Sequence, residues 1–302
     1  AENVLNFLVA TRFVPIFSFM FGMSMGFVID SAIRRGAPAW KILLRRLAAL
    51  LVIGLLHSIL YPGEILRDYA VAGAILLPFV LKVPRSVRLV LGLLATVSAY
   101  AFTGGGALSL PGLFLLGSAA QAYGLPARLE HADRRIGAAT LVFAAASAAA
   151  IPWQAAEGGD PRFFTAGGVA GGLMACLYVC LLALLWRTPV RRALSAVFEP
   201  LGRMALTCYV TASFVMVPAG VLLDSRSTQD VIPGLIVAAA VLPLQWVFCR
   251  LWLSRFAYGP LEWAWRCVTW WRWVPLLRQQ SQQPDNQSSP YRYARLPTTG
   301  VM

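Results

Sequence analysis

Long apolar stretches alternate with short polar segments along most of this chain. A helix needs about 20 residues to cross the hydrocarbon core of a bilayer, and many of these stretches have that length. The expected fold class is all-α: a polytopic bundle of transmembrane helices, forming a single domain over residues 1–278 with parts at 10–124 and 125–278. The nine predicted spans are 10–30, 44–61, 67–83, 88–106, 107–124, 136–153, 165–186, 204–223 and 231–253.

The chain changes character after the last apolar stretch. Residues 254–278 are rich in tryptophan, and a helix there would place several charged side chains near one side. Such a segment is typical of a helix that lies in the membrane interface, here the inner one. From about Gln279 onward Gln, Ser, Pro and Asn dominate, which predicts a disordered cytoplasmic tail over 279–302.

Basic residues gather on one side of the predicted spans. Four short loops and the C-terminal segment hold most of them, whereas the opposite loops hold only Arg67, Arg162 and Arg226. Short loops rich in Lys and Arg stay in the cytoplasm, so the first span runs inward and the C-terminus is cytoplasmic. The cytoplasmic set is Arg34, Arg35, Lys41, Arg45, Arg46, Lys82, Arg85, Arg88, Arg128, Arg134, Arg135, Arg187, Arg191, Arg192, Arg203, Arg255, Arg266, Arg272 and Arg278.

Cysteine labelling tests this orientation. Residues 31–43, 125–135 and 187–202 should be cytoplasmic, whereas 154–164 and 224–230 should face the outside. A reagent that cannot cross the membrane should therefore modify a cysteine placed at Gly158 and leave one at Ala132 unmodified. The reverse labelling pattern would overturn the predicted orientation.

Composition supports a membrane protein and changes the meaning of the net charge. The chain is 58% hydrophobic and 13% charged, with a mean hydropathy of +0.66, whereas soluble domains carry about 25% charged residues. A net charge of +13 can indicate nucleic-acid binding. Here the positive loops face anionic lipid headgroups, and no basic stretch is long enough to read a groove. We therefore expect a lipid bilayer, and no nucleic acid, as partner.

An ionisable cluster at the outer end of the second span carries the most informative chemistry. His57 lies near that end, and Glu64, Arg67 and Asp68 follow a Pro–Gly turn. On a helix, Glu64 and Asp68 would share a face with Arg67 close by. In the functional interpretation His57 moves a proton, the two carboxylates orient it, and Arg67 binds an anionic group. In the structural interpretation the carboxylates stabilise a helix start and His57 bonds a backbone carbonyl.

Further residues are candidates for substrate binding. Arg12 lies near the outer end of the first span, where it either faces the same cavity as His57 or extends to the interface. Tyr69 directly follows the ionisable cluster. Arg203, which precedes a polar run containing Tyr209, either contacts a phosphate from the cytosol or reflects ordinary topology. No CxxC, HExxH, GxSxG or phosphate-binding glycine loop is present, so we expect no metal and no bound cofactor.

Four segments resemble the motifs of one family. They are 17–22 (FSFMFG), 54–73 (GLLHSILYPGEILRDYAVAG), 201–213 (LGRMALTCYVTAS) and 258–269 (YGPLEWAWRCVT). In combination they resemble the YeiB-like family of bacterial inner-membrane proteins, whose C-terminal half is a domain of unknown function. The resemblance covers about residues 10–275 and implies a multi-pass protein of the inner (plasma) membrane. Glu64 stands where the family usually has Asp, and Cys208 where it usually has Asn.

That family is similar to transmembrane acyltransferases that include the lysosomal heparan glucosaminide acetyltransferase. The resemblance implies transfer of an acyl group from cytosolic acyl-CoA, a donor substrate, to a periplasmic or lipid-linked acceptor. The phosphates of acyl-CoA would meet Arg203 at the inner mouth, and the acceptor would meet the cluster around His57. The related enzymes carry their catalytic histidine before the helix that matches 10–30, and we expect such a preceding segment to be missing here. The alternatives are a transporter or flippase of a small anionic or lipid-linked molecule, and a non-catalytic membrane partner.

Overall fold

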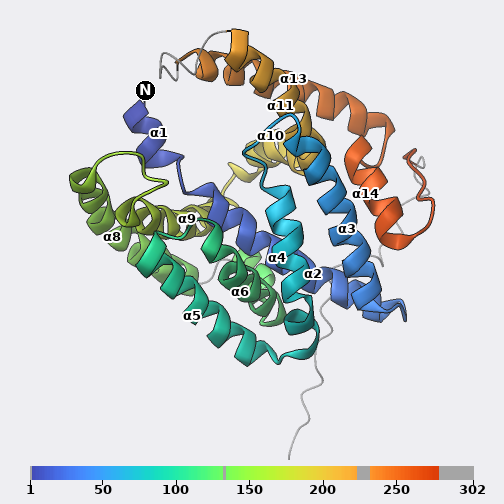
Figure 1. Cartoon of the computed structure of the whole chain (residues 1–302), viewed down its shortest axis with the longest axis horizontal. Helices are drawn as coiled ribbons and strands as arrows, with labels where there is room; N and C mark the ends of the chain where they lie inside the picture. Colours follow the sequence, from blue (N-terminus) through green and yellow to red (C-terminus); the bar gives the residue numbers. More distant parts are fainter. Residues whose placement is uncertain (1, 132–133, 223–231, 279–302) are drawn as a thin grey trace, which may run out of the picture.

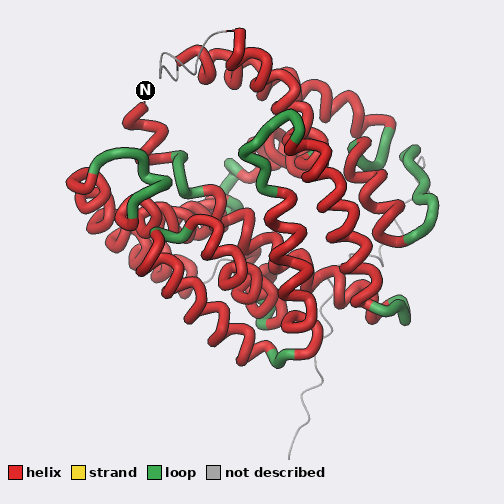
Figure 2. The backbone as a smooth tube through the Cα atoms, viewed as in Figure 1, coloured by secondary structure: helices red, strands yellow, loops and turns green. Residues whose placement is uncertain are grey.

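The computed structural model describes residues 2–131, 134–222 and 232–278. These residues form helices joined by short loops, and they contain no strand beyond one isolated antiparallel bridge between Phe256 and Leu277 (Figure 2). The all-α class expected from the sequence is confirmed. The predicted tail at 279–302, the predicted outer loop at 224–230 and the labelling position Ala132 lie outside the described residues.

The helices follow one another along the chain as shown in Figure 1. They are α1 (Glu2–Leu8), α2 (Phe13–Arg34), α3 (Ala39–Ser58), α4 (Leu66–Lys82), α5 (Arg85–Thr103), the 3-10 helix η1 (Gly106–Ser109), α6 (Leu110–Ala122), α7 (Leu125–His131), α8 (Arg134–Glu157), α9 (Thr165–Leu185), α10 (Arg191–Arg203), α11 (Ala205–Leu222), α13 (Ile232–Arg255) and α14 (Pro260–Trp270).

Six segments of the described chain are long and apolar enough to cross a membrane, which indicates a multi-pass membrane protein. They contain α2, α5, α8, α9, α11 and α13, and they match six of the predicted spans. The pair Gly106–Ala122 and Leu125–His131, bent by 70°, adds a seventh if it forms one span. The prediction of nine spans is therefore not confirmed.

The predicted spans at 44–61 and 67–83 do not correspond to helices that are long and apolar enough to cross a membrane. Helix α3 carries three basic residues in its first half, and α4 is only 17 residues long with an ion pair in its first turn. Both helices nevertheless pack into the bundle, because their apolar faces meet α2 and α6 in the largest buried cluster. That cluster comprises Met25, Leu43, Leu50, Tyr69, Ala70, Leu76, Leu77, Val80, Leu110, Phe114 and Leu115.

Glycines allow α2 and α6 to approach at backbone distance. A Cβ atom at Gly22 would collide with the backbone of Phe114, and one at Gly117 would collide with the backbone of Phe19. Small residues at helix interfaces are typical of membrane bundles, where close van der Waals packing holds helices together. This contact places Phe114 at the centre of the core, where its ring stacks on Phe21 at a centroid distance of 4.9 Å.

Helix α14 lies beside α3 and also contacts α11 (Figure 1). The indole N–H of Trp265 donates to the backbone carbonyl of Arg46 at 2.8 Å, and its ring packs against the main core cluster. At the C-terminal end of α14 the side chains of Trp271 and Trp273 are 72% and 82% exposed. The helix expected in 254–278 is therefore present but docked on the bundle, and its position at the inner interface stays a prediction.

Candidate functional site

His57 and Glu64 form a buried pair between the end of α3 and the start of α4. Nδ1 of the imidazole shares a hydrogen bond with Oε2 of Glu64, while Oε1 accepts the backbone N–H of Leu66. His57 is 4% exposed and Glu64 is 3% exposed. An ionised carboxylate only accepts hydrogen bonds, so in the neutral imidazole Nδ1 carries the proton and Nε2 carries the lone pair.

The second ring nitrogen of His57 is unusual. Nε2 is buried and has no hydrogen-bond partner among the described residues. Buried polar atoms are almost always paired, so each unpaired one calls for an explanation. A histidine that is oriented through one nitrogen and free at the other has the arrangement of a general base.

Gly54 brings the two partners together. It lies one helical turn before His57 and therefore on the same face of α3. A Cβ atom at Gly54 would lie 2.6 Å from the backbone nitrogen of Arg67, so only glycine lets the first turn of α4 lie against α3 at this point. The close approach places Glu64, which just precedes α4, against the imidazole ring.

Tyr209 of α11 is a third member of this cluster. Its ring meets the ring of His57 edge-on, with centroids 5.1 Å apart and an interplanar angle of 61°. Its hydroxyl group donates to Oε2 of Glu64 at 3.4 Å. Tyr209 was visible in the sequence only as part of the polar run after Arg203. Nothing local could link it to Glu64, because the two residues are 145 positions apart.

Arg67 and Asp68 do not join the buried pair. Nε of Arg67 donates to Oδ1 of Asp68 at 3.1 Å, and the two side chains are 45% and 43% exposed. Helix α4 begins at Leu66, which corrects the expectation that Glu64 and Asp68 share one helix face. An exposed ion pair of this kind typically contributes about 0–1 kcal/mol. The structure thus brings together His57 and Glu64 but leaves the other two predicted residues on the surface.

Arg12 lies in a different polar site, at the break between α1 and α2. Its guanidinium is fully buried and donates to Oε1 of Gln154 in α8 at 2.7 Å. It also donates to the carbonyl of Ala10 at 2.5 Å and to Oγ1 of Thr11 at 2.9 Å. Among the described residues it has no carboxylate partner. Of the two alternatives from the sequence, extension to the surface is wrong, because Arg12 is fully buried. That Arg12 faces the same cavity as His57 stays a prediction.

Tyr69 belongs to the hydrophobic core. Its hydroxyl lies 2.8 Å from Oγ of Ser18 and 3.4 Å from the carbonyl of Val14, which ties α4 to α2. Its ring packs edge-on against Phe114 and Phe21, at centroid distances of 5.4 Å and 5.5 Å. The described contacts of Tyr69 are those of a packing residue with a satisfied hydroxyl group.

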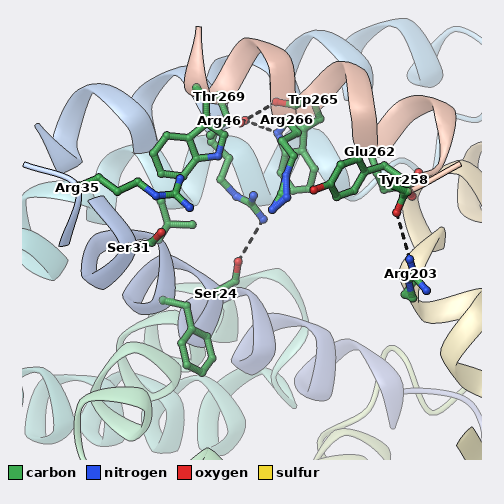
Figure 3. A pocket seen from close by; sticks show the side chains of 14 residues that line it. Ser24, Ser31, Arg35, Arg46, Arg203, Tyr258, Glu262, Trp265, Arg266 and Thr269 are labelled. Atoms are coloured by element: carbon green, nitrogen blue, oxygen red, sulfur yellow. Dashed lines mark hydrogen bonds between the residues drawn. The ribbon is translucent and has the colours of Figure 1, made fainter. Parts of the chain in front are cut away.

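A basic pocket lies between α2, α3 and α14 (Figure 3). Its volume is about 530 Å³. Arg203, the last residue of α10, reaches its edge and donates to the carbonyl of Ala257 at 3.1 Å. The sequence left two interpretations of Arg203 open, a phosphate contact and ordinary topology, and did not link it to the other arginines. The charged residues that line the pocket are Arg35, Arg46, Arg203, Arg266 and Glu262.

Glu262, the one carboxylate among the pocket-lining residues, is bound to α11. Its Oε1 accepts the backbone N–H of Thr207 at 2.9 Å, and its Oε2 accepts the Thr207 hydroxyl at 2.6 Å. The hydroxyl in turn accepts the backbone N–H of Leu261 at 3.2 Å. These bonds join α14 to α11 and direct the negative charge of Glu262 toward the helix rather than toward an arginine.

In the described parts of the chain no group of three or more His, Cys, Asp or Glu side chains is placed to hold a metal ion.

Known proteins similar to this chain are themselves uncharacterized. The family described as "Protein of unknown function (DUF418)" matches residues 123–272. The "Uncharacterized 39.9 kDa protein in amylase 3'region" of Bacillus acidopullulyticus is 30% identical over 295 residues, which cover 91% of this chain and 85% of that protein. The "Uncharacterized protein YxaH" of Bacillus subtilis (strain 168) is 28% identical over 352 residues, covering 92% of this chain and 84% of that protein. No solved structure matches the chain. The similarity extends over almost the whole chain, and the chain belongs to the DUF418 family of proteins of unknown function.

Proposed function

We propose that this multi-pass membrane protein is an acyltransferase, which moves an acyl group from acyl-CoA on the cytoplasmic side to an acceptor on the outer side. The observation that carries the proposal is the buried His57, which Glu64 orients through Nδ1 while Nε2 has no partner among the described residues. The sequence resemblance to transmembrane acyltransferases supports the same chemistry.

The pair would act as a general base. Nε2 of His57 takes the proton from a hydroxyl or amino group of the acceptor while that oxygen or nitrogen attacks the thioester carbonyl carbon. The C–S bond then breaks, the acyl group stays on the acceptor, and the proton held on Nε2 of His57 passes to the departing CoA sulfur, which leaves the imidazole neutral again. Glu64 stabilises the imidazolium that forms, as a carboxylate does in a catalytic triad. Tyr209 donates to the same carboxylate and so helps to fix its position.

The relation between the pair and the basic pocket also favours a long, phosphorylated donor. Arg46 in the pocket and His57 lie on the same helix, α3, about three turns apart and hence on the same face. The rise of an α-helix makes their separation along the axis about 16 Å. A donor that places phosphates among the arginines must therefore reach His57 through an extended arm, and acyl-CoA has this construction.

An assay in membrane vesicles tests the proposal. Inside-out vesicles that carry the protein should convert acyl-CoA labelled in its acyl group into free CoA thiol and a labelled acceptor. Vesicles without the protein serve as the control for background thioester hydrolysis. Equal thiol release with and without the protein would contradict acyl transfer.

A transporter of small anionic or lipid-linked molecules is the second candidate. The observation that favours it is the basic pocket, whose arginines form no ion pair among the described residues. The same vesicles distinguish the two functions. A transporter would move the anion across the membrane with its bonds intact, whereas an acyltransferase breaks the thioester.

A further inference from the structure

The basic pocket concentrates positive charge without balancing it. None of Arg35, Arg46 and Arg266 forms an ion pair with an aspartate or glutamate in the part of the chain that the structure describes, and neither does Arg203. Both carboxylate oxygens of Glu262 already accept hydrogen bonds from Thr207. Like charges that line one cavity repel each other, so gathering Arg46 and Arg266 here is unfavourable without an anion. An anion from outside the described chain would relieve this repulsion.

The guanidinium groups of three pocket arginines lie over the faces of aromatic rings. The Cζ atom of Arg46 lies 3.8 Å from the ring centroid of Trp265, and that of Arg35 lies 4.2 Å from the centroid of Trp270. Arg266 lies over the ring of Tyr258 in the same way, at 4.5 Å. Stacking on a ring uses the face of a guanidinium and leaves the N–H donors along its edge free to bind an anion.

The side chains converge on one space. Figure 3 shows Arg46 and Arg266 extending toward each other between α14 and α2, with Arg35 to one side and Arg203 to the other. One N–H group of Arg46 donates to Oγ of Ser24 at 3.2 Å, which fixes the direction of that side chain. The arginines come from four separate stretches of sequence, and all of them belong to the predicted cytoplasmic set. A ligand would therefore enter from the cytoplasm or from the inner leaflet.

We infer that this pocket binds a phosphate group. A terminal phosphate carries close to two negative charges and three acceptor oxygens, so it can accept hydrogen bonds from several guanidinium groups at once. A single carboxylate offers one charge and two oxygens. The cavity volume of about 530 Å³ lies within the usual range for small-molecule sites and leaves room for the group that bears the phosphate. This inference rests on the proposed function, because it assigns the phosphates of the acyl-CoA donor to the basic pocket. It does not depend on catalysis by His57.

Two sources of phosphate need to be distinguished, a soluble cytosolic compound and a phospholipid headgroup. For the first, calorimetric titration of the detergent-purified protein with inorganic pyrophosphate and with CoA should show binding, whereas pantetheine, which has no phosphate, should not bind. For the second, the melting temperature should be compared in phosphatidylcholine nanodiscs with and without phosphatidic acid. Binding should weaken as salt is raised, because the attraction is electrostatic.

Substitutions locate the binding in this pocket. Arg46→Gln and Arg266→Gln should each weaken the affinity by about tenfold or more, because each removes charge-assisted hydrogen bonds to the phosphate. Arg45→Gln is the matched control: Arg45 neighbours Arg46 on α3 and lies 5.2 Å over the ring of Trp271, but it does not line the pocket. The Arg45→Gln variant should bind pyrophosphate and CoA as tightly as the unmodified protein does. Melting temperatures of all three variants separate loss of binding from loss of folding.

Each outcome decides the inference. Binding of pyrophosphate and CoA that both pocket variants weaken supports a soluble source, and stabilisation by phosphatidic acid alone that both variants lose supports a lipid source. Binding of neither, or binding that both pocket variants retain at full strength, would overturn the phosphate site. If the unmodified protein binds phosphate but transfers no acyl group, only the proposed function is refuted. His57→Gln should still bind phosphate, because His57 does not line the pocket. Acyl transfer with an unchanged KM in Arg46→Gln and Arg266→Gln would refute only the phosphate site.

Discussion

Replacing His57 with glutamine should abolish acyl transfer while the protein still inserts and folds. The glutamine amide can donate to Glu64 in place of Nδ1, so the buried carboxylate keeps a partner. The variant has no nitrogen that can take up a proton, and loss of a general base typically slows a reaction by about 10²–10⁴-fold. The measurement is thiol release from acyl-CoA in membranes, together with thermal stability in detergent.

Alanine at the same position should behave differently. His57→Ala removes the partner of a carboxylate that is 3% exposed, and leaving a buried acceptor unsatisfied typically costs about 1–3 kcal/mol, or more when the acceptor is charged. Loss of activity in this variant alone would therefore be ambiguous. Ser58→Ala is a suitable control, since Ser58 lies next to His57 on α3 but bonds only the carbonyl of Leu55 among the described groups. Full acyl transfer per folded molecule in His57→Gln would remove His57 from the mechanism.

Replacing Gly117 with alanine should destabilise the bundle strongly. The new Cβ atom would collide with the carbonyl oxygen of Phe19, a backbone atom of α2 that cannot turn aside. The two helices would have to separate, which loosens the packing around the fully buried Phe114. Overpacking of this kind typically lowers the free energy of unfolding by about 1–3 kcal/mol, and sometimes by more. Gly22→Ala should act in the same way, because its Cβ would meet the backbone of Phe114.

Thermal unfolding in detergent measures this effect, and the chain offers matched controls. Gly137 in α8 and Gly220 in α11 also lie within helices, but a Cβ atom at either position would meet nothing within 4 Å. Gly137→Ala and Gly220→Ala should therefore leave the melting temperature unchanged or raise it slightly, because alanine favours the helix. If Gly117→Ala proved as stable as Gly137→Ala, the close contact between α2 and α6 would be incorrect.

Part of the candidate site could be found from the sequence because its members are near neighbours in the chain. His57 and Glu64 lie on either side of one Pro–Gly turn, so a turn alone brings them close. The shared helix face expected for Glu64 and Asp68 is wrong, because α4 begins at Leu66 and leaves Glu64 in the turn before it. Tyr209 was missed as a partner since its contact depends on how α11 packs against the rest of the bundle.

The span count shows a similar division. Six of the predicted spans are helices of sufficient length and apolarity, because both properties can be counted along the chain. Helices α3 and α4 carry charges that make them poor spans by composition, yet their apolar faces lie in the core against α2 and α6. The predicted span at 107–124 coincides with the first member of a helix pair, Gly106–Ala122 and Leu125–His131, and the 70° bend follows it. Hydropathy cannot predict such a bend, because it is set by packing.

The sequence by itself determined that this chain forms an all-α, multi-pass membrane protein with an ionisable pair at the end of one helix. Apolar length and composition are properties of single segments and need no knowledge of contacts. Only the tertiary structure decided that Arg12 is buried against Gln154, and that Arg35, Arg46, Arg203 and Arg266 line one pocket. In the sequence each of these arginines could be explained by topology alone. Their convergence depends on the docking of α14 on α3, a contact between segments more than 200 residues apart.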